Sequence, residues 1–257
     1  VEIDVMAEAM RAELQRALRS PTHTMDDSCT GTGPRSLYPY QRFVAGYVTP
    51  ESKRNMLVMH STGTGKTCSM TAIVAGFLRH NIRAPEAIPI VFVAPAGNLQ
   101  GFYSTIVGGC GVIQTLGSSA KSPEARCAEM GVRGYSYIEF ANRLLGSTAD
   151  EDFALRPSKL APRVLVLVDE AHFLVSPEMR QGDGEEREDS IKLKDAYAKL
   201  KGMVTDGRVQ IALFSATIIK RAAWEAGKAL DLLIRGDRGR IPDTATAFAE
   251  RYLRGPK

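Results

Sequence analysis

The sequence predicts an α/β fold in which a mainly parallel, doubly wound sheet carries helices on both faces. Three continuous apolar runs predict buried strands, at residues 88–94 (IPIVFVA), 164–168 (VLVLV) and 209–214 (VQIALF). Helical stretches separate them, including one at residues 67–79, and runs of this kind are typical of parallel strands covered on both sides. Right-handed crossovers would then give the doubly wound arrangement.

The bulk composition is that of a globular protein. The 257 residues are 44% hydrophobic and 24% charged, which allows a sizeable core without disulfides or metals. No run approaches the ~20 apolar residues of a membrane span, and the N-terminus lacks the apolar stretch of a signal peptide. We therefore expect a soluble, intracellular protein with no membrane partner. The net charge of +4 permits a basic patch for nucleic acid without requiring one.

The four cysteines are predicted to be reduced thiols. Cys29, Cys68, Cys110 and Cys127 show neither CxxC pairing nor the spacing of metal ligands. Only an oxidising compartment would favour a disulfide among them.

The core is expected to span residues 37–257, after an N-terminal helix and connector at residues 1–36. Apolar residues near helical spacing predict the helix at residues 3–19, as a packing helix or a partner-binding one. Residues 20–36 have the composition of a connector, and the GTG within them follows no strand, so it is no dinucleotide fingerprint. Residues 177–195 are acidic and almost free of apolar residues, which indicates a solvated loop or a regulatory or partner-binding insertion.

Residues 60–67 (HSTGTGKT) match the phosphate-binding pattern G-x-x-x-x-G-K-[ST], with His60 in place of the first glycine. They follow a short apolar run at residues 56–59 and open the predicted helix. Glycines let successive backbone N–H groups converge on phosphate oxygens, and the helix N-terminus adds partial positive charge. His60 is expected to pack or hydrogen-bond beside the loop.

The loop therefore predicts an ATP site. Lys66 is expected to reach the β- and γ-phosphates, and the Thr67 hydroxyl to coordinate Mg²⁺. The nucleotide-binding residues expected in this loop are Ser61, Thr62, Gly63, Thr64, Gly65, Lys66 and Thr67.

The apolar run at residues 164–168 leads directly into Asp169, Glu170, Ala171 and His172. Carboxylates at the end of a parallel strand lie at the edge of the sheet where ligands bind. Asp169 is expected to hold Mg²⁺, and Glu170 to orient and polarise the water that attacks the γ-phosphate. Glu170 and Lys66 are the predicted catalytic residues.

Three small residues, Ser215, Ala216 and Thr217, end the next apolar run. Their hydroxyls are suited to hydrogen bonds between the acidic box and a nucleic-acid face. We expect them, together with His172, to couple nucleotide state to nucleic acid.

Taken together, these motifs resemble the first motor lobe of a superfamily 2 helicase, a RecA-like P-loop NTPase domain. The resemblance covers about residues 37–252, and its motifs stand in the family's order: YPYQ at 38–41, HSTGTGKT at 60–67, DEAH at 169–172 and SAT at 215–217. It implies that Gln41 reads the adenine edge.

The resemblance also implies nucleic-acid contacts. Residues 95–99 (PAGNL) resemble the motif after the second strand, so the contacts expected there are Pro95, Ala96, Gly97 and Asn98. Residues 136–140 (SYIEF) sit where the next such motif falls. Binding is expected to be mostly to phosphates and independent of sequence, through segments 94–101 and 136–143.

The HSTGTGKT form is similar to that of ATPases from large cytoplasmic DNA viruses, which include the poxvirus nucleoside triphosphate phosphohydrolase and the small subunit of the early transcription factor. Those proteins resemble Snf2-type DNA translocases. This implies DNA rather than RNA as substrate, a partner in the transcription machinery, and the virion or host cytoplasm as location. Ile218 stands where the family has proline after SAT.

A complete motor of this family has a second lobe with an arginine finger. The sequence contains no Q-x-x-G-R-x-x-R run, so the second lobe is expected in another segment or chain. Residues 236–240 (GDRGR) are wrongly patterned and too close to SAT, which favours a solvated turn. Because an arginine finger is worth ~10³–10⁵ in turnover, these residues alone are expected to hydrolyse ATP poorly.

The predicted function is the ATP-binding lobe of a helicase or translocase, with nucleic-acid-stimulated ATP hydrolysis. The alternatives are a non-cycling structural or interaction protein that keeps the fold, and a stand-alone P-loop kinase. Intact Lys66, Thr67, Asp169 and Glu170 oppose the first alternative. The DEAH–SAT pair opposes the second.

Overall fold

The computed structural model describes part of the chain, and the predicted N-terminal helix, the connector and Thr62 lie outside it. The described residues are 37–61, 63–108, 121–146, 155, 163–175, 188–217, 223–236, 241–242 and 244–253. They divide into two compact units, each with its own helices.

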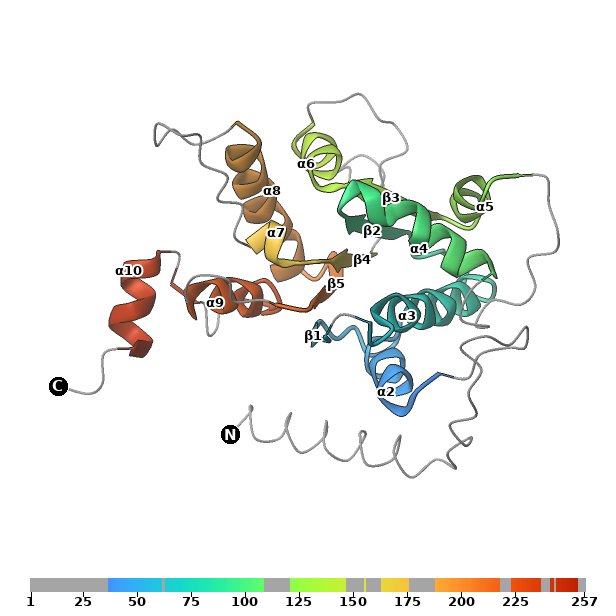
Figure 1. Ribbon diagram of the computed structural model, residues 1–257, viewed down its shortest axis with the longest axis horizontal. Helices are drawn as coiled ribbons and strands as arrows, with labels where there is room; N and C mark the ends of the chain where they lie inside the picture. The colour runs from blue at the N-terminus through green and yellow to red at the C-terminus, as the bar shows by residue number, and fades with distance from the viewer. Residues whose placement is uncertain are drawn as a thin grey trace. The chain divides into compact units, whose positions relative to one another are not determined.

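The second unit (55–64, 86–99 and 131–257) contains a parallel sheet of five strands in the order β1-β5-β4-β2-β3 (Figure 1). The strands are β1 (Met56–Met59), β2 (Ile90–Ala94), β3 (Val132–Ser136), β4 (Val164–Asp169) and β5 (Val209–Ser215). The three runs predicted as strands are confirmed as β2, β4 and β5, the short apolar run at residues 56–59 is β1, and the predicted α/β class with a parallel sheet is confirmed. Strand β2 begins later than predicted, just after Pro89, which has no N–H to donate.

Side chains of alternate strand residues form a core on one face of this sheet. Val93, Val166 and Ile211 are among its fully buried members. Helices α6 (Tyr137–Leu145), α7 (His172–Val175) and α8 (Glu188–Thr205) supply the apolar residues that pack on it (Figure 1). Side chains of the opposite face, such as Phe92 and Leu167, are also buried, so neither face of the central strands meets solvent.

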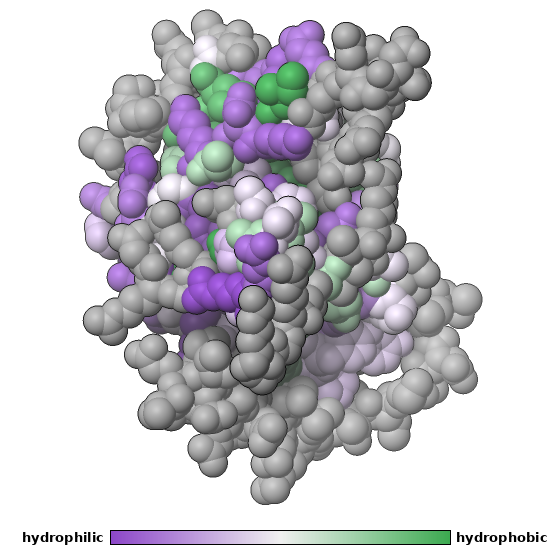
Figure 2. All heavy atoms as spheres, turned by 90° about the vertical axis from the view of Figure 1, so that its left-hand side faces the viewer, coloured by the Kyte–Doolittle hydropathy of each residue, from purple (hydrophilic) through white to green (hydrophobic). Residues whose placement is uncertain are grey.

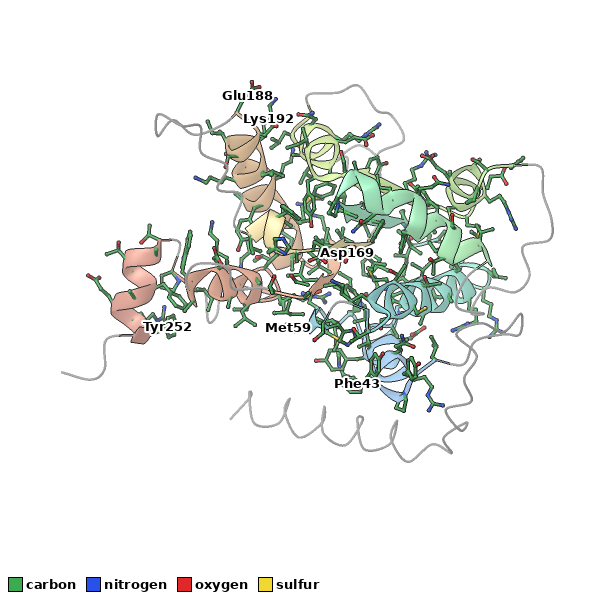
Figure 3. All side chains as sticks on the ribbon, viewed as in Figure 1. Phe43, Met59, Asp169, Glu188, Lys192 and Tyr252 are labelled. Carbon is green, nitrogen blue, oxygen red and sulfur yellow. The ribbon has the colours of Figure 1, made fainter. Side chains whose placement is uncertain are left out.

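Helix α8 corrects the prediction of a solvated loop over residues 177–195. Residues 188–195 are the first two turns of a helix, whereas residues 177–187 lie outside the described part. Acidic residues Glu188 and Asp189 suit the positive end of a helix dipole. Glu188 also pairs with Lys192 one turn later, at 2.6 Å (Figure 3).

The remaining elements of the second unit follow β5. They are α9 (Ala223–Asp231), α10 (Ala245–Phe248) and a π-helical turn at Ala249–Leu253. Lys201 on α8 forms an ion pair with Asp231 on α9, and the hydroxyl of Tyr197 donates to the Lys228 carbonyl at 2.9 Å. Of the GDRGR turn only Gly236 lies within the described residues.

The first unit (1–54, 65–85 and 100–130) contains α2 (Pro39–Tyr47), α3 (Lys66–Asn81) and α5 (Pro123–Glu129). Helix α4 (Ala96–Gly108) starts in the second unit and continues into the first. Helices α2 and α3 pack together, and α3 confirms the helix predicted after the phosphate loop.

One cysteine prediction is wrong. Cys68 on α3 is disulfide-bonded, and its partner lies outside the described residues because Cys127 is a free, buried thiol. The spacing of cysteines along the chain does not show which thiols meet in the fold, so this bond could not be predicted.

The exposed surface mixes polar and apolar side chains. On the face drawn in Figure 2, hydrophilic residues surround smaller apolar areas. The exposed large apolar residues come from several separate elements: Tyr38, Met59, Ile82, Ile191, Leu230 and Tyr252. None of the helices that the structure describes has the length and apolar character needed to cross a bilayer.

Candidate active site

The predicted site residues of the second unit gather at the carboxyl edge of the sheet. All five strands run parallel, so their carboxyl ends share one edge. The register aligns Asp169 with Phe214 at the ends of β4 and β5, and Ala94 with Ser136 at the ends of β2 and β3. The chain leaves the sheet at this edge into the DEAH box, the SAT motif and the PAGNL segment.

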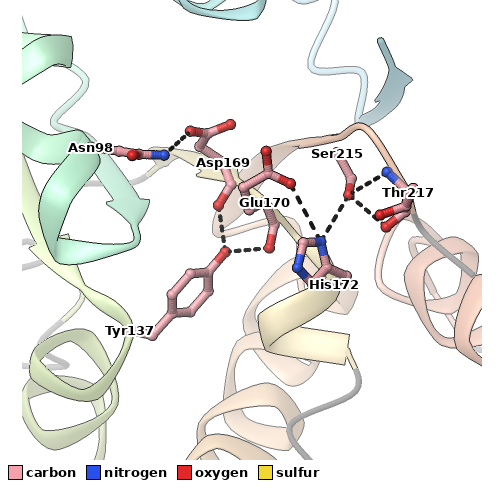
Figure 4. Close-up of polar contacts among 7 residues, drawn as sticks. All are labelled: Asn98, Tyr137, Asp169, Glu170, His172, Ser215 and Thr217. Carbon is pink, nitrogen blue, oxygen red and sulfur yellow. Dashed lines mark hydrogen bonds and ion pairs between the residues drawn. The ribbon is translucent and has the colours of Figure 1, made fainter. Parts of the chain in front are cut away.

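The carboxylate of Asp169 is buried at this edge and is held by a hydrogen bond from a neighbouring side chain. Its side chain is 7% exposed, and its Oδ2 accepts a hydrogen bond from the Asn98 amide at 3.1 Å (Figure 4). Asn98 lies in the first turn of α4, where its own N–H donates to the Pro95 carbonyl at 2.8 Å. The first turn of α4 therefore orients Asp169.

Glu170 has a left-handed backbone, with φ of 56°. This conformation costs a residue with a Cβ about 1–2 kcal/mol, and such strain concentrates at functional sites. Two hydrogen bonds close the turn around it. The Ala171 N–H donates to the Phe214 carbonyl at 2.9 Å, and the Phe173 N–H donates to the Glu170 carbonyl at 3.0 Å.

Tyr137 reaches the same turn from the start of α6. Its hydroxyl donates to the carbonyls of Asp169, at 2.5 Å, and Glu170, at 2.9 Å (Figure 4). Burial, followed by the charges of Asp169 and Glu170, raises the pKa of Tyr137 well above its usual value, so the hydroxyl stays protonated and remains a donor.

His172 lies between the acidic box and the SAT motif. Its Nδ1 is 3.1 Å from Ser215 Oγ and 3.4 Å from Glu170 Oε2 (Figure 4). The Ser215 hydroxyl donates its only proton to the Thr217 carbonyl at 2.9 Å, so Nδ1 carries the hydrogen in its contact with Ser215. This arrangement connects Glu170 to the SAT motif through one imidazole.

The phosphate loop starts beside the SAT motif. Its first residue, His60, donates its backbone N–H to the Ser215 carbonyl at 3.1 Å. Within the loop, the Thr64 hydroxyl donates to the Ser61 carbonyl at 2.7 Å. Gly63 has a left-handed φ of 78°, which suits glycine.

The rest of the loop belongs to the first unit. Gly65 has φ of 79° and directly precedes α3, whose first residues are Lys66 and Thr67. Gln41 is 3% exposed and uses its side chain locally. Its Oε1 accepts from the Tyr38 N–H at 2.9 Å, and its Nε2 donates to the Gly65 carbonyl at 3.1 Å.

The site brings together most, but not all, of the residues predicted for the second unit. Asn98, Asp169, Glu170, His172, Ser215 and Thr217 are joined by direct contacts (Figure 4). Pro95, Ala96 and Gly97 lie in the same segment as Asn98. Ala216 lies between Ser215 and Thr217 in the chain, and its methyl side chain can make no hydrogen bond to the other site residues.

The donor set fits Mg²⁺ held mainly by nucleotide phosphates. Magnesium in such sites takes one or two protein oxygens and keeps phosphate and water ligands. Asp169 offers such an oxygen, in a carboxylate that Asn98 has already oriented. Among the described residues no group of three or more His, Cys, Asp or Glu side chains forms a metal cage, which this mode of binding does not require.

Tyr137 is the residue that sequence reasoning missed. The SYIEF segment was expected to face nucleic acid, but the tyrosine within it points its hydroxyl at the acidic box. The available signal was its position: it directly follows a strand, and the carboxyl ends of parallel strands share an edge. Strand β3 was not predicted, so this signal could not be used.

Neither protein-family models nor curated protein sequences give a match to this chain. Among solved structures, the chain is similar to the SWI2/SNF2 ATPase core of Sulfolobus solfataricus in complex with double-stranded DNA. The TM-score is 0.50 at 13% sequence identity, and the similarity covers 85% of this chain and 39% of that chain. Mss116p bound to single-stranded RNA and AMP-PNP gives a TM-score of 0.45 at 14% identity, covering 75% of this chain and 37% of that chain.

The likeness to the ATPase core bears on the fold. Together with the parallel sheet it shows an α/β domain of the RecA-like class, as predicted. The chain spans about 39% of the length of that ATPase core.

Proposed function

We propose that this chain is the ATP-binding lobe of a helicase or translocase, which hydrolyses ATP under stimulation by nucleic acid. The observation that carries the proposal is the contact network at the carboxyl edge. There Glu170, His172 and Ser215 are linked within hydrogen-bonding or ion-pair distance, and Asn98 donates to the adjacent Asp169. A phosphate-binding loop begins at the same edge, where His60 meets Ser215.

Each group has a role that its chemistry suits. Lys66 would neutralise the β- and γ-phosphates, while Thr67 and Asp169 would hold Mg²⁺. The metal supplies positive charge to the phosphates when it is bound. Gln41 would read adenine through the second hydrogen of its Nε2, since the first already binds the Gly65 carbonyl.

Glu170 would act on the attacking water. Its carboxylate accepts a proton or hydrogen bond from that water, which orients it toward the γ-phosphorus. The contact between Glu170 Oε2 and His172 Nδ1, at 3.4 Å, would hold the carboxylate in place for this task. A change in the position of Glu170 would then be transmitted through His172 to Ser215, the first residue of the SAT motif.

The nucleic-acid partner is proposed on the motif resemblance. DNA is favoured over RNA, and contacts to phosphates would make binding independent of sequence. A role in viral transcription, with a partner in that machinery, is the finer form of this proposal. Turnover by these residues alone is expected to be slow, and a second lobe in the same or another protein chain would raise it.

The test is ATP hydrolysis measured with and without single-stranded DNA, double-stranded DNA and RNA. Glu170→Gln removes the carboxylate at nearly constant shape, and we expect it to lower turnover about 100-fold or more. Glu86→Gln is the matched control, because Glu86 is exposed and lies outside the network. It should behave like the parent chain.

The outcomes separate the candidate functions. Equal turnover in the parent chain and Glu170→Gln would refute the motor and favour a non-cycling protein that keeps the fold. Stimulation by RNA but not DNA would refute the DNA preference alone. Robust stimulated turnover by the 257 residues would refute the expectation that a second lobe is needed.

A further inference from the structure

We propose that Tyr137 is a positioning residue that holds Glu170 in its reactive conformation. The proposal rests on the proposed ATP hydrolysis and assigns to α6 a task that the motif resemblance does not give it. The hydroxyl of Tyr137 would restrain the backbone turn that carries the Glu170 side chain, by hydrogen bonds to its carbonyls.

The geometry of the two hydrogen bonds makes this restraint specific. The carbonyl of Asp169 belongs to the peptide group before the Glu170 Cα, and the carbonyl of Glu170 belongs to the peptide group after it. Tyr137 Oη lies 2.5 Å from the first carbonyl oxygen and 2.9 Å from the second (Figure 4). The single hydroxyl hydrogen is therefore shared between carbonyl oxygens on both sides of the Glu170 Cα, and this contact restrains both peptide groups and with them φ and ψ of Glu170.

Glu170 needs such a restraint because its φ of 56° is unfavourable for a side chain with a Cβ. A strained conformation persists only when its surroundings over-determine it. The other two bonds of the turn use the Glu170 carbonyl, which accepts from the Phe173 N–H, and the Ala171 N–H, so both hold the peptide group after the Glu170 Cα. The Tyr137 hydroxyl, in contrast, also reaches the Asp169 carbonyl, in the peptide group before the Glu170 Cα.

Tyr137 is itself well supported. It is the first residue of α6, directly after Ser136, whose side chain caps the helix by accepting from the Glu139 N–H at 3.3 Å. Its ring is 7% exposed and lies 5.7 Å from the Phe173 ring, measured between centroids. A hydroxyl on so constrained a ring can set the position of a neighbouring carboxylate closely.

The experiment compares Tyr137→Phe with Tyr197→Phe. Both variants lose a tyrosine hydroxyl that donates to a backbone carbonyl in the same unit, the second of them at 2.9 Å to Lys228. Both should therefore lower the melting temperature by a similar few degrees. Only Tyr137→Phe removes the hydrogen bonds to the Asp169 and Glu170 carbonyls. A difference between the two variants in exchange or turnover therefore measures the positioning of Glu170.

Two readouts are measured. The first is hydrogen exchange of the peptide over residues 170–175, which we expect to be about tenfold faster in Tyr137→Phe and unchanged in Tyr197→Phe. The second is steady-state ATP hydrolysis. Because small misplacements of a reacting group can cost up to about 100-fold, we expect kcat to fall about 10- to 100-fold while KM for ATP stays within about twofold.

Equal exchange in the two variants would overturn the proposal, and so would faster exchange with an unchanged kcat. A parent chain with no hydrolysis above Glu170→Gln would instead refute the proposed function. In that case exchange alone decides whether Tyr137 holds the turn.

Discussion

Gly63 and Gly65 share a left-handed backbone but differ in their surroundings, so they make a matched pair for substitution. A Cβ added at Gly65 would lie 2.6 Å from the buried Gln41 amide, whereas one added at Gly63 has no atom of the other described residues within 4 Å. Gly63→Ala should therefore cost only the left-handed strain, about 1–2 kcal/mol. Gly65→Ala should cost about 1 kcal/mol more, since Gln41 must also give up its bond to the Gly65 carbonyl.

Urea unfolding measures both costs. The double variant Gln41→Ala with Gly65→Ala is the control, because removing the amide removes the clash. Its loss of unfolding free energy should be smaller than the sum of the losses in Gln41→Ala alone and in Gly65→Ala alone. Additive losses would mean that Gln41 does not limit the space at Gly65.

The buried Cys127 thiol predicts a decline in stability at high pH. Burial raises the pKa of Cys127 from 9.0 to about 11. Below pH 9 the thiol is protonated in both the folded and the unfolded chain, so it adds no pH dependence. Between pH 9 and 11 the unfolded chain releases a proton that the folded chain keeps, so stability falls as pH rises.

The measurement is the free energy of unfolding of the parent and Cys127→Ala at pH 8 to 11. The advantage of the parent should shrink by up to about 2 kcal/mol over this range. A constant difference between the two proteins would show that the Cys127 pKa is not raised by folding.

At this scale the sequence predicted types of residue better than their contacts. Asp169 and Glu170 could be placed at a sheet edge because a continuous apolar strand leads into them. The bond from Asn98 to Asp169 could not be predicted, because the resemblance assigned Asn98 to nucleic acid. Side-chain partners depend on distances that motif order does not encode.

At the scale of elements, the Lys201–Asp231 and Lys192–Glu188 ion pairs of α8 should differ greatly in their contribution to the free energy of unfolding. Lys201 and Asp231 are 12% and 9% exposed, with Nζ 2.7 Å from Oδ1, and they join α8 to α9. Lys201→Met leaves the buried Asp231 charge without this partner, so we expect a loss of about 3 kcal/mol. Lys192→Met is the control on the same helix, since its pair with Glu188 is exposed and should change stability little.

Thermal or urea unfolding of the two single variants tests this difference. A further variant, Lys201→Met with Asp231→Leu, should recover part of the loss because it removes the buried charge. If Lys201→Met and Lys192→Met are equally stable, the α8–α9 pair contributes nothing beyond a surface pair.

Helices and strands were predictable where burial is continuous along the chain. Strand β4 is buried at every position, so its residues form a continuous apolar run that predicts a strand. Strand β3 alternates, with Val132 buried and Arg133 exposed, and it lies at the edge of the sheet, so its five residues carry a weak signal. The first turns of α8 were missed because their charged residues look like a loop until the apolar positions that follow are included.

For the whole molecule, nucleotide binding should be visible as added stability. A ligand that binds only the folded chain stabilises it by about 2.7 kcal/mol at 100 times its Kd. For a chain of this size that corresponds to a rise of roughly 5–10 °C in melting temperature. ATP with Mg²⁺ should produce the rise, and removing Mg²⁺ with a chelator should reduce it.

Lys66→Ala is the control for this shift, since it removes the predicted phosphate contact. It should abolish most of the rise while leaving the melting temperature without nucleotide close to that of the parent. An equal rise in both proteins would mean that ATP binds elsewhere than at the phosphate loop.

The order of the strands could not be predicted from the sequence. Apolar periodicity identifies strands one at a time, whereas the order β1-β5-β4-β2-β3 depends on pairings between distant segments. The edge location of the site was nevertheless predictable, because it follows from parallel strands in any order.

The left-handed turn at position 170 sets folding and chemistry against each other. Glycine there would relieve about 1–2 kcal/mol of strain and cost about 0.5–1 kcal/mol in backbone freedom, so Glu170→Gly should melt at a higher temperature than the parent. A lineage that kept this protein only as a scaffold would gain stability from that single replacement. The same replacement would remove the carboxylate that the proposed reaction needs, so greater stability here would come at the expense of the proposed activity.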